Sequence, residues 1–238
     1  MFIVNIASIN IKILNKYSYI EKICSKYIIN ADNFAFTVSV TDDEISAEKT
    51  DPESKIGLPY FESIAIFRKI ALKILEYNVF LMHGVLLETG DRGLLLCARS
   101  GVGKTTHAKN LVKYLGEENA RIINGDKPWI LVENGIPYGF GSPWCGKEGI
   151  SVNKRIEVTD VCFIERAKEN SVEKLPAEQI FVRIMNQVWY PNLMKYNRML
   201  LFDLLEDMIT KVNFYLIKCN TDLDSARVTC DAIIKDKL

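Results

Sequence analysis

Residues 98–106 read ARSGVGKTT, a combination of residue types that could bind phosphate. Gly101 and Gly103 would let backbone N–H groups turn toward phosphate oxygens, because no Cβ stands in the way. The ammonium of Lys104 would reach the β- and γ-phosphates, and the Thr105 hydroxyl would hold Mg²⁺. This pattern is typical of a phosphate-binding loop, or P-loop, and predicts a nucleoside triphosphate site.

A P-loop needs a strand before it and a helix after it, and the sequence predicts both. The apolar run GLLLC at 93–97 predicts a buried strand, and 104–115 has helical character. The first position is Ala98 where the motif has glycine. A glycine-rich turn that binds nothing is the alternative. The predicted nucleotide-binding residues are Ser100, Gly101, Val102, Gly103, Lys104, Thr105 and Thr106.

A histidine is predicted to lie beside this loop. The residues TGDR at 89–92 predict a turn between a strand over 79–88 and the strand over 93–97. With the turn centred between Gly90 and Asp91, His83 faces Ala98, where it could contact bound phosphates or a metal. The alternative is a ring that only packs, because a slip of one residue would turn it to the other face.

An aspartate follows the next apolar strand. Asp126 comes after the short strand predicted at 121–124, about twenty residues beyond Lys104. In P-loop enzymes a carboxylate in this place holds Mg²⁺, orients water, or takes a proton from an attacking hydroxyl. The sequence around it, GDKP, is also good turn chemistry, so an aspartate that caps its own backbone is the alternative.

The segment 141–149, GSPWCGKEG, predicts a loop that closes over a ligand. Lys147 or Lys154 could add positive charge near a transferred phosphoryl group, and Arg99 faces either phosphate or solvent. The alternative is an ordinary loop with Trp144 packed on the core.

Composition limits the classes of partner. Thirty basic residues balance thirty acidic ones among 238, which gives no support for a nucleic-acid partner. No apolar run is long enough for a membrane span, and we expect no signal peptide. The six cysteines are scattered without a CxxC pair, so we expect reduced thiols and a cytoplasmic protein.

The pattern of elements predicts an α/β fold, with a mixed sheet carrying helices on its faces. Residues 1–14 and 34–41 alternate as strands do, and the charged stretch 41–55 predicts a linker. We therefore predict a small β-rich annex over 1–55 and a nucleotide-binding domain over 56–238. Further helices are predicted over 59–77, 177–188, 193–209 and 221–234, and further strands over 130–132, 160–164 and 213–217.

The stretch LMHGVLLETGDRGLLLCARSGVGKTT resembles the kinase core of the HPr kinase/phosphorylase and phosphoenolpyruvate carboxykinase superfamily. In that superfamily a histidine begins a strand, a hairpin follows, and the next strand enters an SGxGKT-type P-loop. The similarity extends more weakly through IINGDKPW at 122–129 and GSPWCGK at 141–147.

The resemblance implies that His83, Thr105 and Asp126 gather round a divalent metal while Lys104 holds phosphate. It also implies an acidic base toward a serine-like hydroxyl. Here one aspartate stands where the relatives have two, with Gly125 before it and Lys127 after it. One carboxylate therefore has both roles, or another residue supplies the second.

We therefore predict a kinase that uses ATP or GTP with Mg²⁺ or Mn²⁺ and transfers the γ-phosphoryl to a hydroxyl on a small molecule or peptide. Asp126, His83 and Lys104 are the predicted catalytic residues, and Thr105, Asp126 and His83 the predicted metal ligands. The alternatives are a P-loop NTPase switch and a nucleotide-sensing protein without catalysis. The sequence leaves the acceptor and the oligomeric state open, a homo-oligomer included.

Overall fold

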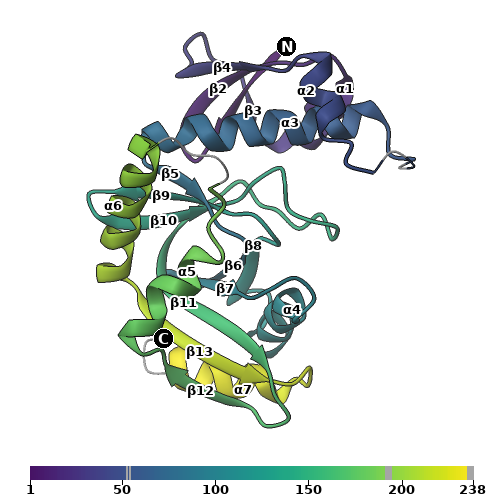
Figure 1. Cartoon of the computed structure of the whole chain (residues 1–238). Coiled ribbons are helices and arrows are strands. Elements are labelled where there is room, and N and C mark those ends of the chain that lie inside the picture. The colour runs from purple at the N-terminus through teal and green to yellow at the C-terminus, as the bar shows by residue number, and fades with distance from the viewer. Residues whose placement is uncertain (52, 54, 191–194, 235–238) are drawn as a thin grey trace.

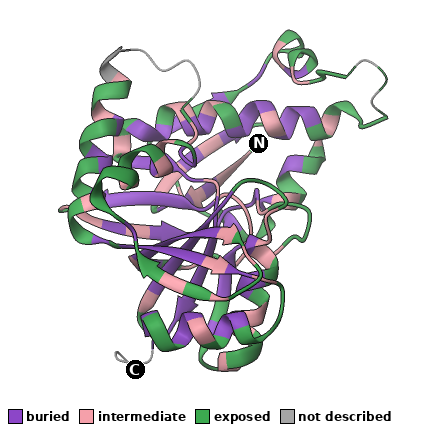
Figure 2. Cartoon of the chain, turned by 60° about the horizontal axis from the view of Figure 1, so that its bottom comes forward, coloured by how far each residue is buried: buried purple, intermediate pink, exposed green. Residues whose placement is uncertain are grey.

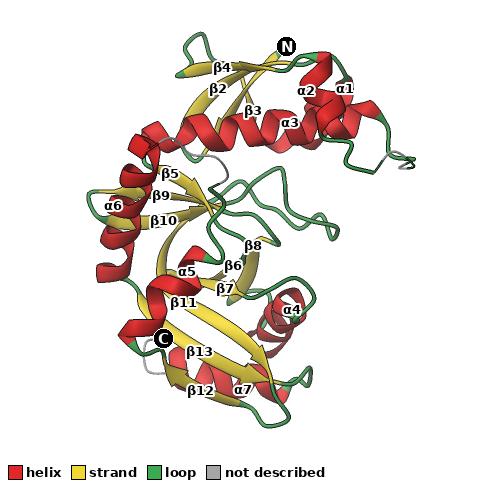
Figure 3. Cartoon of the chain, in the orientation of Figure 1, coloured by secondary structure: helices red, strands yellow, loops and turns green. Residues whose placement is uncertain are grey.

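The chain folds into two β-sheets with helices between and around them (Figure 1). The computed structural model describes residues 1–51, 53, 55–190 and 195–234. The fold is mixed α/β, with a large curled sheet of parallel and antiparallel strands and flanking helices (Figure 3). No helix in the described ranges is long and apolar enough to cross a membrane.

The N-terminal sheet has four strands in the order β3-β1-β2-β4. A tight turn with positive φ at Ala7 and Ser8 joins β1 and β2 into an antiparallel hairpin, and β4 pairs with β2 in parallel. The strands are β1 (Phe2–Ile6), β2 (Ile9–Leu14), β3 (Ile28–Ile29) and β4 (Phe36–Ser39). The helical elements here are α1 (Ser18–Ile23), the 3-10 turn η1 (Ser25–Tyr27) and α2 (Asp42–Ala47).

The large sheet has nine strands, and its central path runs β5-β9-β10-β11-β7-β6-β8. The long strand β11 pairs in parallel with both β7 and β13, whereas β6 pairs with β7 and β8 in antiparallel fashion. The strands are β5 (Val79–Leu81), β6 (Val85–Thr89), β7 (Arg92–Cys97), β8 (Ala120–Asn124), β9 (Trp129–Glu133), β10 (Ile136–Phe140), β11 (Arg155–Arg166), β12 (Ser171–Lys174) and β13 (Asn213–Cys219).

Helices cover both faces of the large sheet, and buried residues concentrate in its strands (Figure 2). One apolar cluster joins the sheet to α5 and α6, and another joins its other face to α4 and α7. A third cluster joins the N-terminal sheet, α3 and the β5–β9 edge. The helical elements are α3 (Leu58–Lys73), η2 (Ile74–Tyr77), α4 (Lys104–Leu115), α5 (Ala177–Met185), α6 (Lys195–Lys211), α7 (Asp224–Thr229) and the π-helical turn η3 (Cys230–Ile234).

The buried helix α3 connects the two sheets. Its residues Ile66 and Ile70 are completely buried in the cluster that both sheets share. The carboxylate of Glu62, also on α3, is buried and accepts the backbone N–H of Tyr17 at 3.0 Å. The N-terminal sheet is therefore packed onto the rest of the chain. The division into domains over 1–55 and 56–238 stays a prediction.

Two local expectations differ from the structure. The stretch predicted as a linker contains α2, because Thr41 and Glu44 form a reciprocal capping box at its start. The single strand predicted over 79–88 is broken into β5 and β6 at His83 and Gly84, where the backbone bonds leave the ladder. Residues 193 and 194 of the predicted helix over 193–209 lie outside the described residues.

Candidate functional site

The predicted strand–loop–helix is present, with β7 before the loop and α4 after it. Gly101 and Gly103 have φ of 80° and 122°, and an added Cβ would meet no atom within 4 Å at either position. The glycines are therefore required by the backbone conformation, because left-handed φ strains other residues. Gly103 also ends the loop at the N-terminus of α4, whose free N–H groups and dipole favour an anion.

Lys104, the first residue of α4, has its side chain turned into the protein. The residue is 7% exposed, and its Nζ donates to the carbonyl oxygen of Ala98 at 2.9 Å. The same Nζ lies 3.2 Å from His83 Nε2. An ammonium has only donors, so Nε2 is the acceptor in this pair. Burial lowers the pKa of Lys104, an effect that the charge of Asp126 partly opposes.

The predicted hairpin register is present between β6 and β7, but the strand pair expected between His83 and Ala98 is not formed. The ladder between β6 and β7 pairs Val85 with Leu96 and ends there. Beyond it, the backbone N–H of His83 donates to the carbonyl of Gln187 at 2.7 Å. With its amide nitrogen toward them, Gln187 donates to the carbonyls of His83 at 3.1 Å and Ala98 at 3.3 Å. The Gln187 side chain therefore bridges the backbones of His83 and Ala98, which lie beyond the end of the β6–β7 ladder.

The surroundings of His83 lower the pKa of its ring and so favour the neutral form. Burial is the largest cause that lowers the pKa of His83, and the charge of Lys104 lowers it further. Asp126, with Oδ1 3.5 Å from His83 Nε2, opposes these effects. A neutral imidazole with Nε2 as acceptor can hold a donor or a cation, which the charged form cannot.

Asp126 faces the same place from the end of β8. The turn after β8 is capped by Asn124, whose Oδ1 accepts the backbone N–H groups of Asp126 at 2.9 Å and Lys127 at 2.7 Å. The Asp126 carboxylate is thereby left for other contacts, with the ring of His83 and the ammonium of Lys127. Asn124, and not Asp126, therefore caps this turn, and the functional role of Asp126 stays a prediction.

The loop after β10 lies directly against Asp126. Gly146 has φ of 79°, and a Cβ added to it would stand 2.9 Å from the Asp126 Cβ. A Cβ added to Gly125 would stand 3.1 Å from the carbonyl oxygen of Cys145. An acidic side chain at position 125 would therefore require this loop to move. In the same loop Trp144 packs against Phe67 of α3, with ring centroids 4.8 Å apart.

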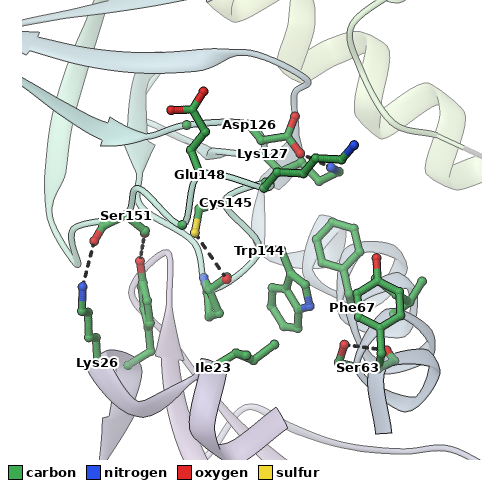
Figure 4. Close-up of a pocket in the computed structure, with 18 of the residues that line it drawn as sticks. Ile23, Lys26, Ser63, Phe67, Asp126, Lys127, Trp144, Cys145, Glu148 and Ser151 are labelled. Carbon is green, nitrogen blue, oxygen red and sulfur yellow. Dashed lines mark hydrogen bonds and ion pairs between the residues drawn. The ribbon is translucent and has the colours of Figure 1, made fainter. Parts of the chain in front are cut away.

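These elements surround a cavity of about 970 Å³ (Figure 4). One side is formed by predicted site residues, namely His83, Ser100, Thr105 and Asp126. The opposite side comes from α1, η1 and α3, with Ile23, Lys26, Ser63 and Phe67 labelled in Figure 4. The loop after β10 contributes the remaining wall, residues 143–149.

The side chains at the cavity could supply only a few ligands to a metal ion, so the ion would take its other ligands from phosphate and water. No group of three or more histidine, cysteine, aspartate or glutamate side chains converges to hold an ion in the described ranges. Asp126 and Thr105 both line the cavity, and Mg²⁺ in phosphate sites typically takes one or two carboxylates together with phosphates and water. The Nε2 atom of His83 already contacts the ammonium of Lys104, so the role of His83 as a metal ligand stays a prediction.

The structure separates the two lysines predicted to add charge near the phosphoryl group. Lys147 lines the cavity, whereas Lys154 forms an ion pair with Glu88, which also binds Arg121. Sequence reasoning missed Asn124 and Gln187, which position Asp126 and His83. An asparagine two residues before Asp126 was a readable signal for the first, because asparagine commonly caps such turns.

Comparison with known proteins gives a distant structural similarity and no sequence match. No protein-family model matches the chain, and no curated protein matches it. Among solved structures the chain is similar to the Hpr(Ser) kinase/phosphatase from Coxiella burnetii, at 12% identity and a TM-score of 0.40. That similarity covers 66% of this chain and 92% of the other. It is compatible with a remote structural relationship and assigns neither a family nor an activity.

Proposed function

We propose that this chain is a kinase that binds a nucleoside triphosphate on the loop 98–106 and transfers the γ-phosphoryl group to a hydroxyl acceptor. The observation behind the proposal is the convergence of three titratable side chains beside that loop. His83 Nε2 is 3.2 Å from Lys104 Nζ and 3.5 Å from Asp126 Oδ1, although the three residues come from separate segments. A loop that merely turned the chain would not need this grouping.

The roles follow from the chemistry of each group. Backbone N–H groups of 100–106 cradle the phosphates, and Lys104 neutralises charge on the β- and γ-phosphates. Thr105 and Asp126 hold Mg²⁺ or Mn²⁺, which supplies further neutralisation of phosphate charge when bound. Asp126 accepts the proton of the attacking hydroxyl, and catalysis otherwise consists of positioning and electrostatic stabilisation.

A second carboxylate is available in the cavity if one aspartate does not serve both roles. Asp126 and Glu148 are the two carboxylates among the described lining residues, and Glu148 pairs with Lys109 of α4. Glu148 is 43% exposed in its side chain and lies on the loop that contacts Asp126. We propose Glu148 as the group that takes over metal binding when Asp126 acts as the base.

The proposal is tested by supplying the protein with γ-labelled ATP and a cell extract, then searching by mass spectrometry for a newly phosphorylated species. Lys104→Ala is the matched control, because it removes one phosphate contact and changes none of the residues that line the cavity. We expect labelled product with the wild type and none above background with the variant. Label released only as inorganic phosphate would contradict transfer to an acceptor.

One observation favours a hydrolysing switch or a nucleotide sensor as the second candidate. The Asp126 carboxylate forms an ion pair with Lys127, and no acidic side chain fits at position 125 without movement of the loop. A carboxylate that already contacts a lysine is less available to a metal ion or to a substrate hydroxyl. Tight ATP binding without product in any extract would favour the sensor, and steady release of inorganic phosphate would favour the switch.

A further inference from the structure

The cavity extends well beyond the residues that the proposed kinase chemistry requires. Its volume of about 970 Å³ lies at the upper end of the range for small-molecule sites. Of the loop 98–106, only Ser100 and Thr105 line the cavity. The cavity therefore lies on the side of the loop where Thr105 is proposed to hold the metal. Asp126 and His83 stand at this opening, where the acceptor hydroxyl must approach the transferred group.

The far wall of the cavity is built by the N-terminal part of the chain. Tyr19, Lys22 and Ile23 of α1 and Ser25, Lys26 and Tyr27 of η1 line it. The aromatic rings of Tyr19 and Tyr60 meet there edge to face, 6.3 Å between centroids, and both residues are more than a third exposed. This wall therefore combines apolar surface with two flexible cations.

Specific hydrogen bonds fix the position of this wall relative to Asp126. The Tyr27 hydroxyl is hydrogen-bonded to the Ser151 hydroxyl, and the side chain of Asn153 donates to the Lys26 carbonyl at 3.1 Å. Ser151 in turn pairs with Asn124, the residue that caps the Asp126 turn. The N-terminal wall is thus connected to the catalytic carboxylate through the loop that follows β10.

The charges that face the cavity are unbalanced. Both lining carboxylates already have cationic partners, Asp126 with Lys127 and Glu148 with Lys109. The ammonium groups of Lys22 and Lys147 have no hydrogen bond or ion pair with any described residue, and the ammonium of Lys26 has only the Ser151 carbonyl at 3.4 Å. Three lysines at the cavity therefore lack a carboxylate partner, which favours an anionic ligand.

We propose that the wall formed by α1 and η1 is the acceptor subsite, and that Lys22, Lys26 and Lys147 select a hydroxyl acceptor that carries carboxylate or phosphate groups. This inference rests on the proposed kinase function. The same chemistry could come from a small hydroxy acid or from an acidic peptide with a serine. Either source would place its anionic groups on the lysines and its hydroxyl at Asp126.

The test compares Lys22→Ala/Lys26→Ala with the control Lys49→Ala/Lys55→Ala. The control pair has the same change of charge in the same part of the chain but does not line the cavity. The acceptors are a panel of hydroxy acids, a serine peptide rich in aspartate and glutamate, and neutral counterparts with alcohols, asparagine and glutamine. The affinity for Mg-ATP, kcat, and KM for each acceptor are measured at two salt concentrations.

We expect the cavity variant to raise KM for the preferred anionic acceptor about five- to tenfold at low salt, with less effect at high salt. ATP affinity and kcat should remain unchanged, and the control pair should behave as the wild type. The hydroxy acids and the peptide report which source is preferred. An unchanged KM, or an equal loss of ATP affinity, would overturn the inference, since the lysines would then be idle or serve the nucleotide.

Direct binding keeps the inference separate from the proposed function. Fluorescence anisotropy of the labelled acidic peptide, and calorimetry with the hydroxy acids, need no turnover. Anionic probes that bind the wild type and not the cavity variant would support the subsite even without transfer. Transfer to neutral acceptors with the lysines removed would support the kinase and refute the subsite. Absence of binding by all anionic probes would also refute it.

Discussion

Two aspartates in this chain, one buried in the large sheet and one at the cavity, differ in how many of their carboxylate contacts the protein itself supplies. Asp160 of β11 is completely buried, forms an ion pair with Arg92, and accepts hydrogen bonds from Thr159 at 2.6 Å and Asn213 at 3.2 Å. Asp126 keeps 22% of its side chain exposed, and among the described residues its carboxylate contacts Lys127 and His83. The Asp160 carboxylate therefore has its hydrogen-bonding capacity filled by neighbouring side chains. Asp126 is positioned through its backbone, and its carboxylate remains accessible to a ligand.

The histidines repeat this contrast. His107 is buried in α4 between the hydroxyls of Thr229 at 3.1 Å and Ser225 at 3.4 Å, whereas His83 faces the cavity. The chain has two histidines, so one has a structural place and the other a candidate functional one. Burial lowers the pKa of both, which means that a shifted pKa alone does not identify the functional residue.

The largest expected effect is on the free energy of unfolding, when the buried Asp160 is replaced. Asp160→Ala leaves the Arg92 guanidinium, 11% exposed, without its partner, so unfolding in urea should require about 3–5 kcal/mol less. The control is Glu173→Ala, which breaks an exposed ion pair with Lys218 and should cost less than about 1 kcal/mol. If the two variants were equally stable, the distinction between a saturated and an open carboxylate would be unfounded.

A smaller effect, on binding rather than on stability, is expected at Lys104. Lys104→Ala removes the charge to the phosphates and leaves the backbone cradle, so the affinity for Mg-ATP should fall by about 2–4 kcal/mol. Calorimetry measures this loss directly. The control Lys113→Ala removes the same charge from the exposed last turn of α4 and should bind ATP as the wild type does. Unchanged affinity in Lys104→Ala would remove the basis for the phosphate site.

The pH dependence of stability should come mainly from His107. Burial lowers its pKa to about 4, whereas the unfolded chain titrates near 6.5, so the unfolded state binds the proton first. Stability should therefore fall as the pH drops from 7 to 5, by about 2 kcal/mol. Unfolding curves across this range should show that slope in the wild type and a much weaker one in His107→Gln. A slope that disappears instead in His83→Gln would reverse the assignment.

The local pattern of the sequence was enough to predict one side of the cavity. The apolar run before the glycines, the lysine after them and the turn at Gly90 set strand, helix and hairpin register, since each depends on residues close in sequence. The break at His83 was not predicted, because it depends on Gln187, a residue about one hundred positions away. No short-range pattern reports such a contact.

The other side of the cavity could not be predicted, for a related physical reason. Lys22 and Lys26 belong to short elements without a motif, and their place opposite Asp126 follows from the burial of α3 between two sheets and from the Tyr27–Ser151 hydrogen bond. The helix α2 was missed because charged residues that suggest a linker also suit the first turn of a capped helix.

The rate of phosphoryl transfer in Asp126→Asn, set beside its free energy of unfolding, tests the central claim most directly. Asparagine preserves the size of the side chain and removes the charge that would hold Mg²⁺ or accept a proton. At saturating Mg²⁺ we predict a loss of transfer or hydrolysis of about 10²-fold or more in a protein that still folds and still binds ATP. Asp160→Asn should show the reverse, with lowered stability and normal turnover per folded molecule. Equal rates in wild type and Asp126→Asn would contradict the account and make Asp126 a structural residue.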